Sequence, residues 1–165
     1  MRHLLVVGKT LFSAACAVLI FGFITRHLRA LDPFIPLVLP PWVAVAGVIL
    51  LAAGSLLAIA CIGLFAAGGA LTPGPTFPDP PTFISRGPYR LVRNPMSKGG
   101  FTVLAGWGCY LRSPTLIVFA FLMLGLMHLF VVYVEEPKLE RRFGQSYRDY
   151  RGRVGRWLPR RRASA

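Results

Sequence analysis

Two apolar stretches separated by a short turn run through residues 99–137, GGFTVLAGWGCYLRSPTLIVFAFLMLGLMHLFVVYVEEP. Serine is a good helix N-cap and proline suits the first helical position, so Arg112-Ser113-Pro114 predicts a tight turn followed by a helix start. The two stretches therefore predict an antiparallel helical hairpin. Its second leg ends on two adjacent glutamates and a proline.

Two further apolar stretches precede the hairpin, and hydrophobic residues make up 55% of the 165-residue chain, whose mean hydropathy is +0.58. This composition predicts an all-α fold, a single integral membrane domain with about four transmembrane helices. The expected spans are about residues 4–24, 42–67, 97–111 and 114–135. The third span is weak, because residues 99–111 rise only about 20 Å as a helix, against a hydrocarbon core of about 30 Å. This span therefore has to include residues from its flanks, tilt in the membrane or end before the far side of the hydrocarbon core.

The first span could instead be a signal peptide, because residues 13–16, SAAC, resemble a lipoprotein cleavage site. Lys9 leaves only a short apolar region before this cysteine, while the apolar run continues to Ile24, which favours a retained membrane anchor. Cys16, Cys61 and Cys109 lie singly in apolar segments and form no metal-binding or disulfide pattern. We therefore predict no metal site.

The basic residues predict the orientation of the chain. With both termini on one side, a four-span arrangement places every lysine and arginine on that side except Arg26, Arg29 and Arg112. The positive-inside rule then predicts cytoplasmic termini, a cytoplasmic loop over residues 68–96 and a cytoplasmic tail over residues 137–165, in a bacterial inner membrane. The net charge of +13 lies beside the spans and in the tail, which favours contact with anionic membrane lipids over nucleic acid.

Residues 68–98, between the second and third spans, hold half of the chain's 14 prolines, so this segment cannot form a regular helix or a central strand. Its second half combines apolar residues with four cations, Arg86, Arg90, Arg93 and Lys98. Such a segment could present arginine forks to an anionic group, or it could serve only as a topology signal.

Glu135 and Glu136 lie at the expected C-terminus of a helix, where the helix dipole disfavours anions and the two carboxylates repel each other. Pro137 disfavours helical geometry at Glu136, so the chain is expected to turn there. The pair therefore requires cations or a ligand, unless it is a solvated helix end. His128 lies about 20° from Glu135 on a helical wheel, which makes it either a functional group or a hydrogen-bonded structural histidine.

Three segments together carry a family resemblance: GPYRLVRNPM at residues 87–96, the hairpin, and EEPKLERRFGQSYRDYRGRVGRWLPR at residues 135–160. They resemble the isoprenylcysteine carboxyl methyltransferases and phospholipid methyltransferases, which are integral membrane enzymes. The family signature is Arg-His-Pro-x-Tyr-x-Gly followed by Glu-Glu, and here it corresponds to residues 93–99 and 135–136. Asn94 replaces the histidine and Ser97 the tyrosine, which removes contacts that need an imidazole or a phenol.

The resemblance implies S-adenosylmethionine-dependent methylation of a lipophilic acceptor, either a carboxylate such as that of isoprenylcysteine or a lipid amine. It implies a donor pocket built by the hairpin and the C-terminal segment. The implied donor-binding residues are Tyr89, Arg90, Arg93, Asn94, Pro95, Met96, Gly99, Glu135 and Glu136. His128 and Arg93 are the catalytic candidates, and an amine acceptor would need a base such as His128.

The tail carries an amphipathic pattern, since Leu139, Phe143, Tyr147, Tyr150, Val154 and Trp157 recur at spacings of three and four. This pattern predicts one or two short interfacial helices that help to close the cofactor site. Two other functions stay open: a non-enzymatic membrane scaffold or adaptor, and an NADPH-dependent relative of the sterol reductases. The scaffold predicts no donor binding.

Overall fold

The structure is a computed structural model, and it describes residues 19–67 and 85–160. Residues 4–18 of the predicted anchor, Cys16 and residues 68–84 of the predicted loop lie outside the described residues.

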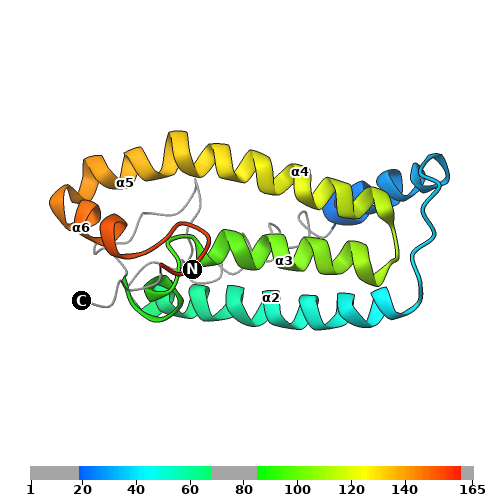
Figure 1. The fold of residues 1–165 in the computed structure, drawn as a ribbon, viewed down its shortest axis with the longest axis horizontal. Helices are drawn as coiled ribbons and strands as arrows, with labels where there is room; N and C mark the ends of the chain where they lie inside the picture. Colours follow the sequence, from blue (N-terminus) through cyan, green and yellow to red (C-terminus); the bar gives the residue numbers. More distant parts are fainter. Residues whose placement is uncertain (1–18, 68–84, 161–165) are drawn as a thin grey trace, which may run out of the picture.

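Three helices run side by side along the length of the molecule (Figure 1): α2 (Trp42–Ala67), α3 (Pro95–Tyr110) and α4 (Pro114–Phe130). Residues 19–29 form a further helical segment, followed by the short 3-10 helix η1 (Asp32–Phe34). A second 3-10 helix, η2 (Gly87–Arg90), precedes α3. The described residues are thus all-α, as predicted, with one isolated bridge between Val92 and Gly155.

The predicted hairpin is confirmed, including its cap. Ser113 is the N-cap of α4, where its hydroxyl accepts a hydrogen bond from the backbone N–H of Leu116 at 3.3 Å and Pro114 follows at the first helical position. The carboxylate of Asp32 in η1 accepts further bonds from the Ser113 hydroxyl at 2.8 Å and the Thr115 N–H at 3.1 Å. The hairpin turn is therefore tied to the segment that precedes α2.

The helix does not end at the glutamate pair, so the predicted turn at Glu136 is wrong. A π-helical turn, η3 (Val131–Glu135), joins α4 to α5 (Glu136–Phe143), and Glu136 has helical backbone angles of φ −61° and ψ −43°. The Glu136 N–H donates to the carbonyl of Val131, five residues earlier. This wider turn carries the helix past Pro137, which has no N–H to donate.

The helix finally ends at Phe143. Gly144 follows with φ +54°, a conformation that glycine adopts without strain, and α6 (Gln145–Arg153) begins there. The prediction of one or two short helices in the tail corresponds to α5 and α6.

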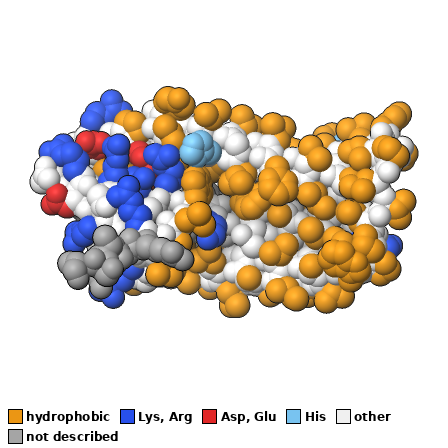
Figure 2. All heavy atoms as spheres, in the orientation of Figure 1, with side chains coloured by type: hydrophobic (Ala, Val, Ile, Leu, Met, Phe, Trp, Pro, Cys, Tyr) orange, Lys and Arg blue, Asp and Glu red, His pale blue; other side chains and the backbone are white. Residues whose placement is uncertain are grey.

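Two helices are long and apolar enough to cross a membrane, Trp42–Phe65 and the continuous helix Pro114–Phe143. The weaker α3 borrows residues from its N-terminal flank, since it starts at Pro95, and its 16 residues rise about 24 Å. Large apolar side chains on α2 and α4 point outward, and Leu56 and Phe121 are 68% and 60% exposed. Figure 2 shows hydrophobic side chains over most of one face and most of the charged ones gathered at the end that carries α5 and α6. This distribution suits contact with lipid along the helices and with water or headgroups at one end.

Close contact between α2 and α3 depends on glycines. A Cβ atom added to Gly54 would lie 2.8 Å from the backbone nitrogen of Val103, and one added to Gly106 would lie 2.8 Å from that of Leu51. Small residues that let helix backbones approach are typical of membrane helix pairs. The contact fixes α3 against α2 and leaves its other face for α4.

Candidate active site

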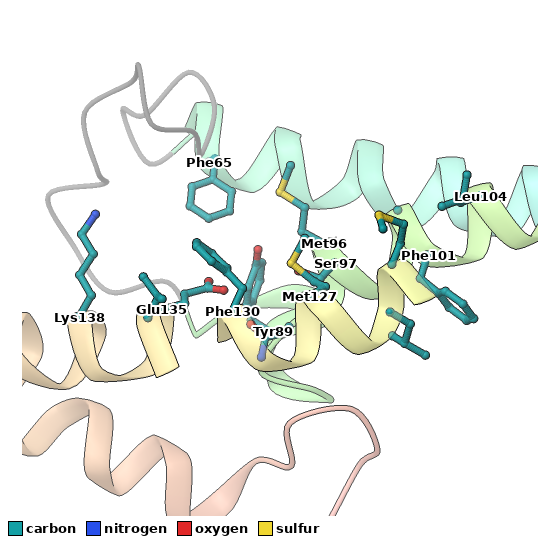
Figure 3. Close-up of a pocket in the computed structure, with 15 residues that line it drawn as sticks. Phe65, Tyr89, Met96, Ser97, Phe101, Leu104, Met127, Phe130, Glu135 and Lys138 are labelled. Atoms are coloured by element: carbon teal, nitrogen blue, oxygen red, sulfur yellow. The ribbon is translucent and has the colours of Figure 1, made fainter. Parts of the chain in front are cut away.

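A pocket of about 620 Å³ lies where the hairpin meets the end of α2, a volume typical of small-molecule sites. Its lining comes from α2, η2, α3, α4, η3 and α5: Phe65, Tyr89, Asn94, Met96, Ser97, Gly100, Phe101, Leu104, Met123, Leu124, Met127, Phe130, Val134, Glu135 and Lys138. Figure 3 shows Lys138 and Glu135 toward one end of this pocket and Phe101 and Leu104 toward the other. The pocket is therefore polar at one end and apolar at the other.

Asn94 lines the pocket from the position just before α3. The segment is held by its backbone, since the N–H groups of Arg93 and Asn94 donate to the carbonyls of Gly155 at 2.8 Å and Arg156 at 3.3 Å. Asn94 is only 7% exposed, and its side-chain Nδ2 has no hydrogen-bond partner among the described residues. A buried amide donor without a partner costs free energy. A ligand in the pocket would supply the missing acceptor.

The two glutamates are consecutive residues of the helix and point in different directions. Glu135 lines the pocket, whereas Glu136 is 5% exposed and faces the C-terminal segment. One extra residue in the turn shifts the helical register by about 100°. Met127, eight residues before Glu135, therefore shares its pocket face, and His128, eight residues before Glu136, shares the face that contacts the C-terminal segment.

Glu136 is held between two arginines. Its Oε1 lies 3.0 Å from Nη1 of Arg93 and accepts a hydrogen bond from Nε of Arg156 at 2.7 Å, while its Oε2 accepts from Nη2 of Arg156 at 2.9 Å. The side chains of Arg93 and Glu136 are 9% and 6% exposed. The cluster contains one buried carboxylate and two guanidinium groups, so its net charge is positive. The two hydrogen bonds from Arg156 to Glu136 form a bidentate pair, which is a strong kind of arginine–carboxylate contact.

Two aromatic residues fasten the tail to the bundle. The hydroxyl of Tyr150 in α6 donates to the carbonyl of Tyr89 at 2.6 Å, and the indole N–H of Trp157 donates to Nδ1 of His128 at 2.9 Å. Residues 154–157, which we name the C-terminal strap, thus contact the loop before α3 and the C-terminal end of α4. The strap holds Arg93, Asn94 and Glu136 in place.

Burial raises the pKa of the Tyr89 phenol, with a smaller contribution in the same direction from the nearby Cys61 thiol. The phenol therefore stays protonated at neutral pH, when it can donate a hydrogen bond but cannot act as a base. Its ring also packs edge-on against Phe65, with the centroids 5.9 Å apart. Tyr89 consequently forms a neutral aromatic wall of the pocket.

Comparison with known proteins identifies the family of the chain. Residues 42–146 match the family model described as phospholipid methyltransferase. The chain belongs to the phospholipid methyltransferase family. Every residue that lines the pocket falls inside the matched region, whereas the C-terminal strap falls outside it. No curated protein matches the chain.

Family membership and the two long apolar helices make the chain a membrane protein of a methyltransferase family. This agrees with the resemblance read from the sequence. Within residues 19–67 and 85–160 no group of three or more histidine, cysteine, aspartate or glutamate side chains could hold a metal ion.

The structure brings part of the predicted site together. Tyr89, Asn94, Met96 and Glu135 line the pocket. Pro95 is buried at the start of α3, and Arg93 and Glu136 form the ion cluster behind Asn94.

The remaining predicted residues lie elsewhere. Arg90 is exposed at the end of η2. Gly99 faces α2, where an added Cβ would lie 3.1 Å from the carbonyl oxygen of Gly54. His128 contacts Trp157 and does not line the pocket. These placements indicate that Gly99 serves the packing of α3 against α2 and that His128 supports the tail.

Several functional candidates were not found by sequence reasoning, namely Phe65, Gly100, Met127, Phe130, Lys138 and Arg156. Lys138 follows Glu135 by three residues, so the helix periodicity that continues through Pro137 could have placed both on one face. Arg156 is one of many arginines in the tail, and no sequence pattern distinguishes it.

Proposed function

We propose that the protein transfers a methyl group from S-adenosylmethionine to a lipophilic acceptor at a membrane surface. The observation that carries this proposal is the pocket, in which the carboxylate of Glu135 and the unpartnered amide of Asn94 share one cavity with an apolar wall. Membership of the phospholipid methyltransferase family supports the same reaction class.

The pocket residues fit the chemistry of this donor. S-adenosylmethionine carries a sulfonium and an ammonium, a carboxylate and ribose hydroxyls. Glu135 can accept hydrogen bonds from the ammonium or a hydroxyl, and Asn94 Nδ2 can donate to an oxygen or a ring nitrogen. The aromatic faces of Phe65, Tyr89 and Phe130 can stabilise a cation. The lining thus offers this donor a carboxylate acceptor, an amide N–H and aromatic faces.

When bound, S-adenosylmethionine supplies a methyl group activated by the positive sulfur. The chain contributes by holding both reactants in line, which alone can provide much of a displacement rate. An ionised carboxylate acceptor needs no base, whereas an amine acceptor must lose a proton, and the Glu135 carboxylate lines the pocket where that proton would be released. Arg93 then acts indirectly, by neutralising Glu136 behind Asn94.

We place the pocket at the cytoplasmic face of a bacterial inner membrane, within a single domain whose termini are both cytoplasmic. The tail helices α5 and α6 hold six of the 15 described lysines and arginines, and Figure 2 shows cations gathered at the pocket end of the molecule. The positive-inside rule assigns such an end to the cytoplasm. A water-soluble donor could then enter from the cytoplasm and a lipid acceptor from the bilayer.

Calorimetric titration of detergent-purified protein with S-adenosylmethionine tests the proposal. The unmodified protein should bind the donor, and Glu135→Gln should weaken binding by about tenfold or more, because a charge-assisted hydrogen bond is worth about 1.5–3 kcal/mol. Glu140→Gln is the matched control, since Glu140 lies on α5 with its side chain 33% exposed and pairs with the half-exposed Arg148 and Arg151.

A folded, unmodified protein that does not bind the donor would overturn the proposal and leave the scaffold alternative. Equal affinity in Glu135→Gln and Glu140→Gln would overturn the role of Glu135 alone. Binding of NADPH in place of S-adenosylmethionine would favour the reductase alternative.

A further inference from the structure

We propose that the apolar end of the pocket holds one hydrocarbon chain of the methyl acceptor and that Gly100 determines whether this chain fits. The inference rests on the proposed function, since it concerns the acceptor of that reaction. It assigns a specificity role to a glycine of α3 that lies beside the glycine of the family signature.

The apolar end is a continuous strip along α3. Ser97, Gly100, Phe101 and Leu104 line the pocket at the spacing of one helix face, and they cover about 10 Å along the axis from Ser97 to Leu104. Only Ser97 carries a polar side chain, at the end nearest Asn94. A hydrocarbon chain is the kind of ligand that such a strip favours.

The facing wall comes from α4. Met123, Leu124 and Met127 line the same space, and the two methionines have flexible side chains that adapt to apolar ligands. Phe101 is held in place by an edge-on contact with Phe121, with ring centroids 5.5 Å apart. The apolar end is thus enclosed by both legs of the hairpin.

S-adenosylmethionine does not suit this end of the pocket. Its hydroxyls, carboxylate and ammonium would lose their hydrogen bonds with water, and the side chains of Phe101, Leu104, Met123 and Leu124 offer no partners in return. The donor is therefore expected at the Glu135 end. The acceptor places its reactive head beside the donor and its chain along α3.

Gly100 differs from the other glycines of α3. Added Cβ atoms on Gly99 and Gly106 would approach α2 at 3.1 Å or less, and one on Gly108 would approach Ile117 at 3.0 Å, whereas one on Gly100 would meet nothing within 4 Å. Helix packing therefore does not require a glycine at position 100. Added Cβ atoms on Gly63 and Gly125 also meet nothing within 4 Å, but of these three glycines only Gly100 lines the pocket. The space that its missing side chain leaves is therefore space for a ligand.

Photo-crosslinking tests the inference without an activity measurement. The protein in nanodiscs would be labelled with two probes, hexadecylamine and palmitate, each carrying a diazirine at the middle of its chain, and the labelled peptides mapped by mass spectrometry. We expect labelling near Leu104 and Met123 that excess unmodified hexadecylamine or palmitate removes. Either head group supports the inference, because the inference concerns the chain.

Gly100→Leu should reduce the competed labelling by about tenfold or more, because its side chain would fill the space of several methylene groups. Gly125→Leu is the matched control: Gly125 lies on α4, does not line the pocket, and an added Cβ there also meets nothing within 4 Å. Its labelling should equal that of the unmodified protein. Leu104→Trp, which fills the same space from the next helical turn, provides a second blocking variant if Gly100→Leu does not fold.

Competed labelling that stays unchanged in folded Gly100→Leu or Leu104→Trp would overturn the inference, as would the absence of competed labelling with both probes. The donor titration described above is independent of these results. Donor binding without competed labelling would overturn the inference alone. Competed labelling without donor binding would overturn the proposed function and the assignment of the chain to a methyl acceptor, and would leave only a hydrocarbon-chain site limited by position 100.

Discussion

The carboxylate of Glu136 accepts two hydrogen bonds from the guanidinium of Arg156, at 2.7 and 2.9 Å, although 20 residues separate them. This contact joins α5 to the C-terminal strap. Arg93 approaches the same carboxylate from the loop before α3. Three chain segments therefore meet at one buried acid, directly behind the pocket residues Asn94 and Glu135.

Glu136→Gln is expected to destabilise the fold by about 3 kcal/mol, because it leaves two guanidinium groups without their counter-ion in a buried place. Thermal unfolding in detergent would show the change as a lowered Tm. Glu140→Gln, which breaks only partly exposed pairs with Arg148 and Arg151, should stay within about 1 kcal/mol of the unmodified protein. Equal Tm values for the two variants would contradict the buried cluster.

The local features of the fold could be predicted from the sequence. Helix α2 runs over the residues of the long apolar stretch, 42–67, and Ser113 caps α4 as its type and position predicted. Both depend on neighbouring residues alone, since an unbroken apolar run and a serine-proline pair act within a few residues.

The arrangement of the site could not be predicted in the same way. Which glutamate faces the pocket depends on one widened turn of helix, whereas the sequence favoured the end of the helix and a turn of the chain at Glu136. The choice of Arg156 among the tail arginines depends on a tertiary contact across 20 residues. The periodicity of an ideal helix predicted that His128 and Glu135 share a helix face. The π-helical turn contains one extra residue, so His128 shares a face with Glu136 instead.

Gly54→Ala is expected to destabilise the protein, whereas Gly63→Ala on the same helix should be neutral or stabilising. Both changes gain helix propensity of up to about 1 kcal/mol. At Gly54, however, the new Cβ would lie 2.9 Å from the carbonyl oxygen of Gly99, and at Gly63 it meets nothing within 4 Å. Unfolding of the two variants in parallel would measure the difference, and a Gly54→Ala protein more stable than Gly63→Ala would contradict the α2–α3 contact.

Asp32→Ala is expected to loosen the start of α4, because the Ser113 hydroxyl and the Thr115 N–H both lose their acceptor. The cost should be about 1–2 kcal/mol, the usual effect of losing a helix cap. Hydrogen exchange at the Thr115 amide should become faster, while exchange in the middle of α4 stays as before. Asp32→Asn, which retains a side-chain oxygen, should show a smaller change, and equal exchange in all three proteins would rule out the cap.

Substitutions of His128 can distinguish a catalytic base from a support for the tail. A general base typically contributes about 10²–10⁴-fold to a rate, so its loss should nearly abolish methyl transfer. The hydrogen bond from Trp157 to Nδ1 instead predicts support, because the ring is directed at the C-terminal strap and not at the pocket. His128→Gln should therefore reduce the transfer of labelled methyl groups to a membrane lipid extract by less than about tenfold. His128→Leu, which removes the acceptor, should lower the Tm more than His128→Gln does, and a loss of transfer in His128→Gln as large as in Glu135→Gln would restore the catalytic role.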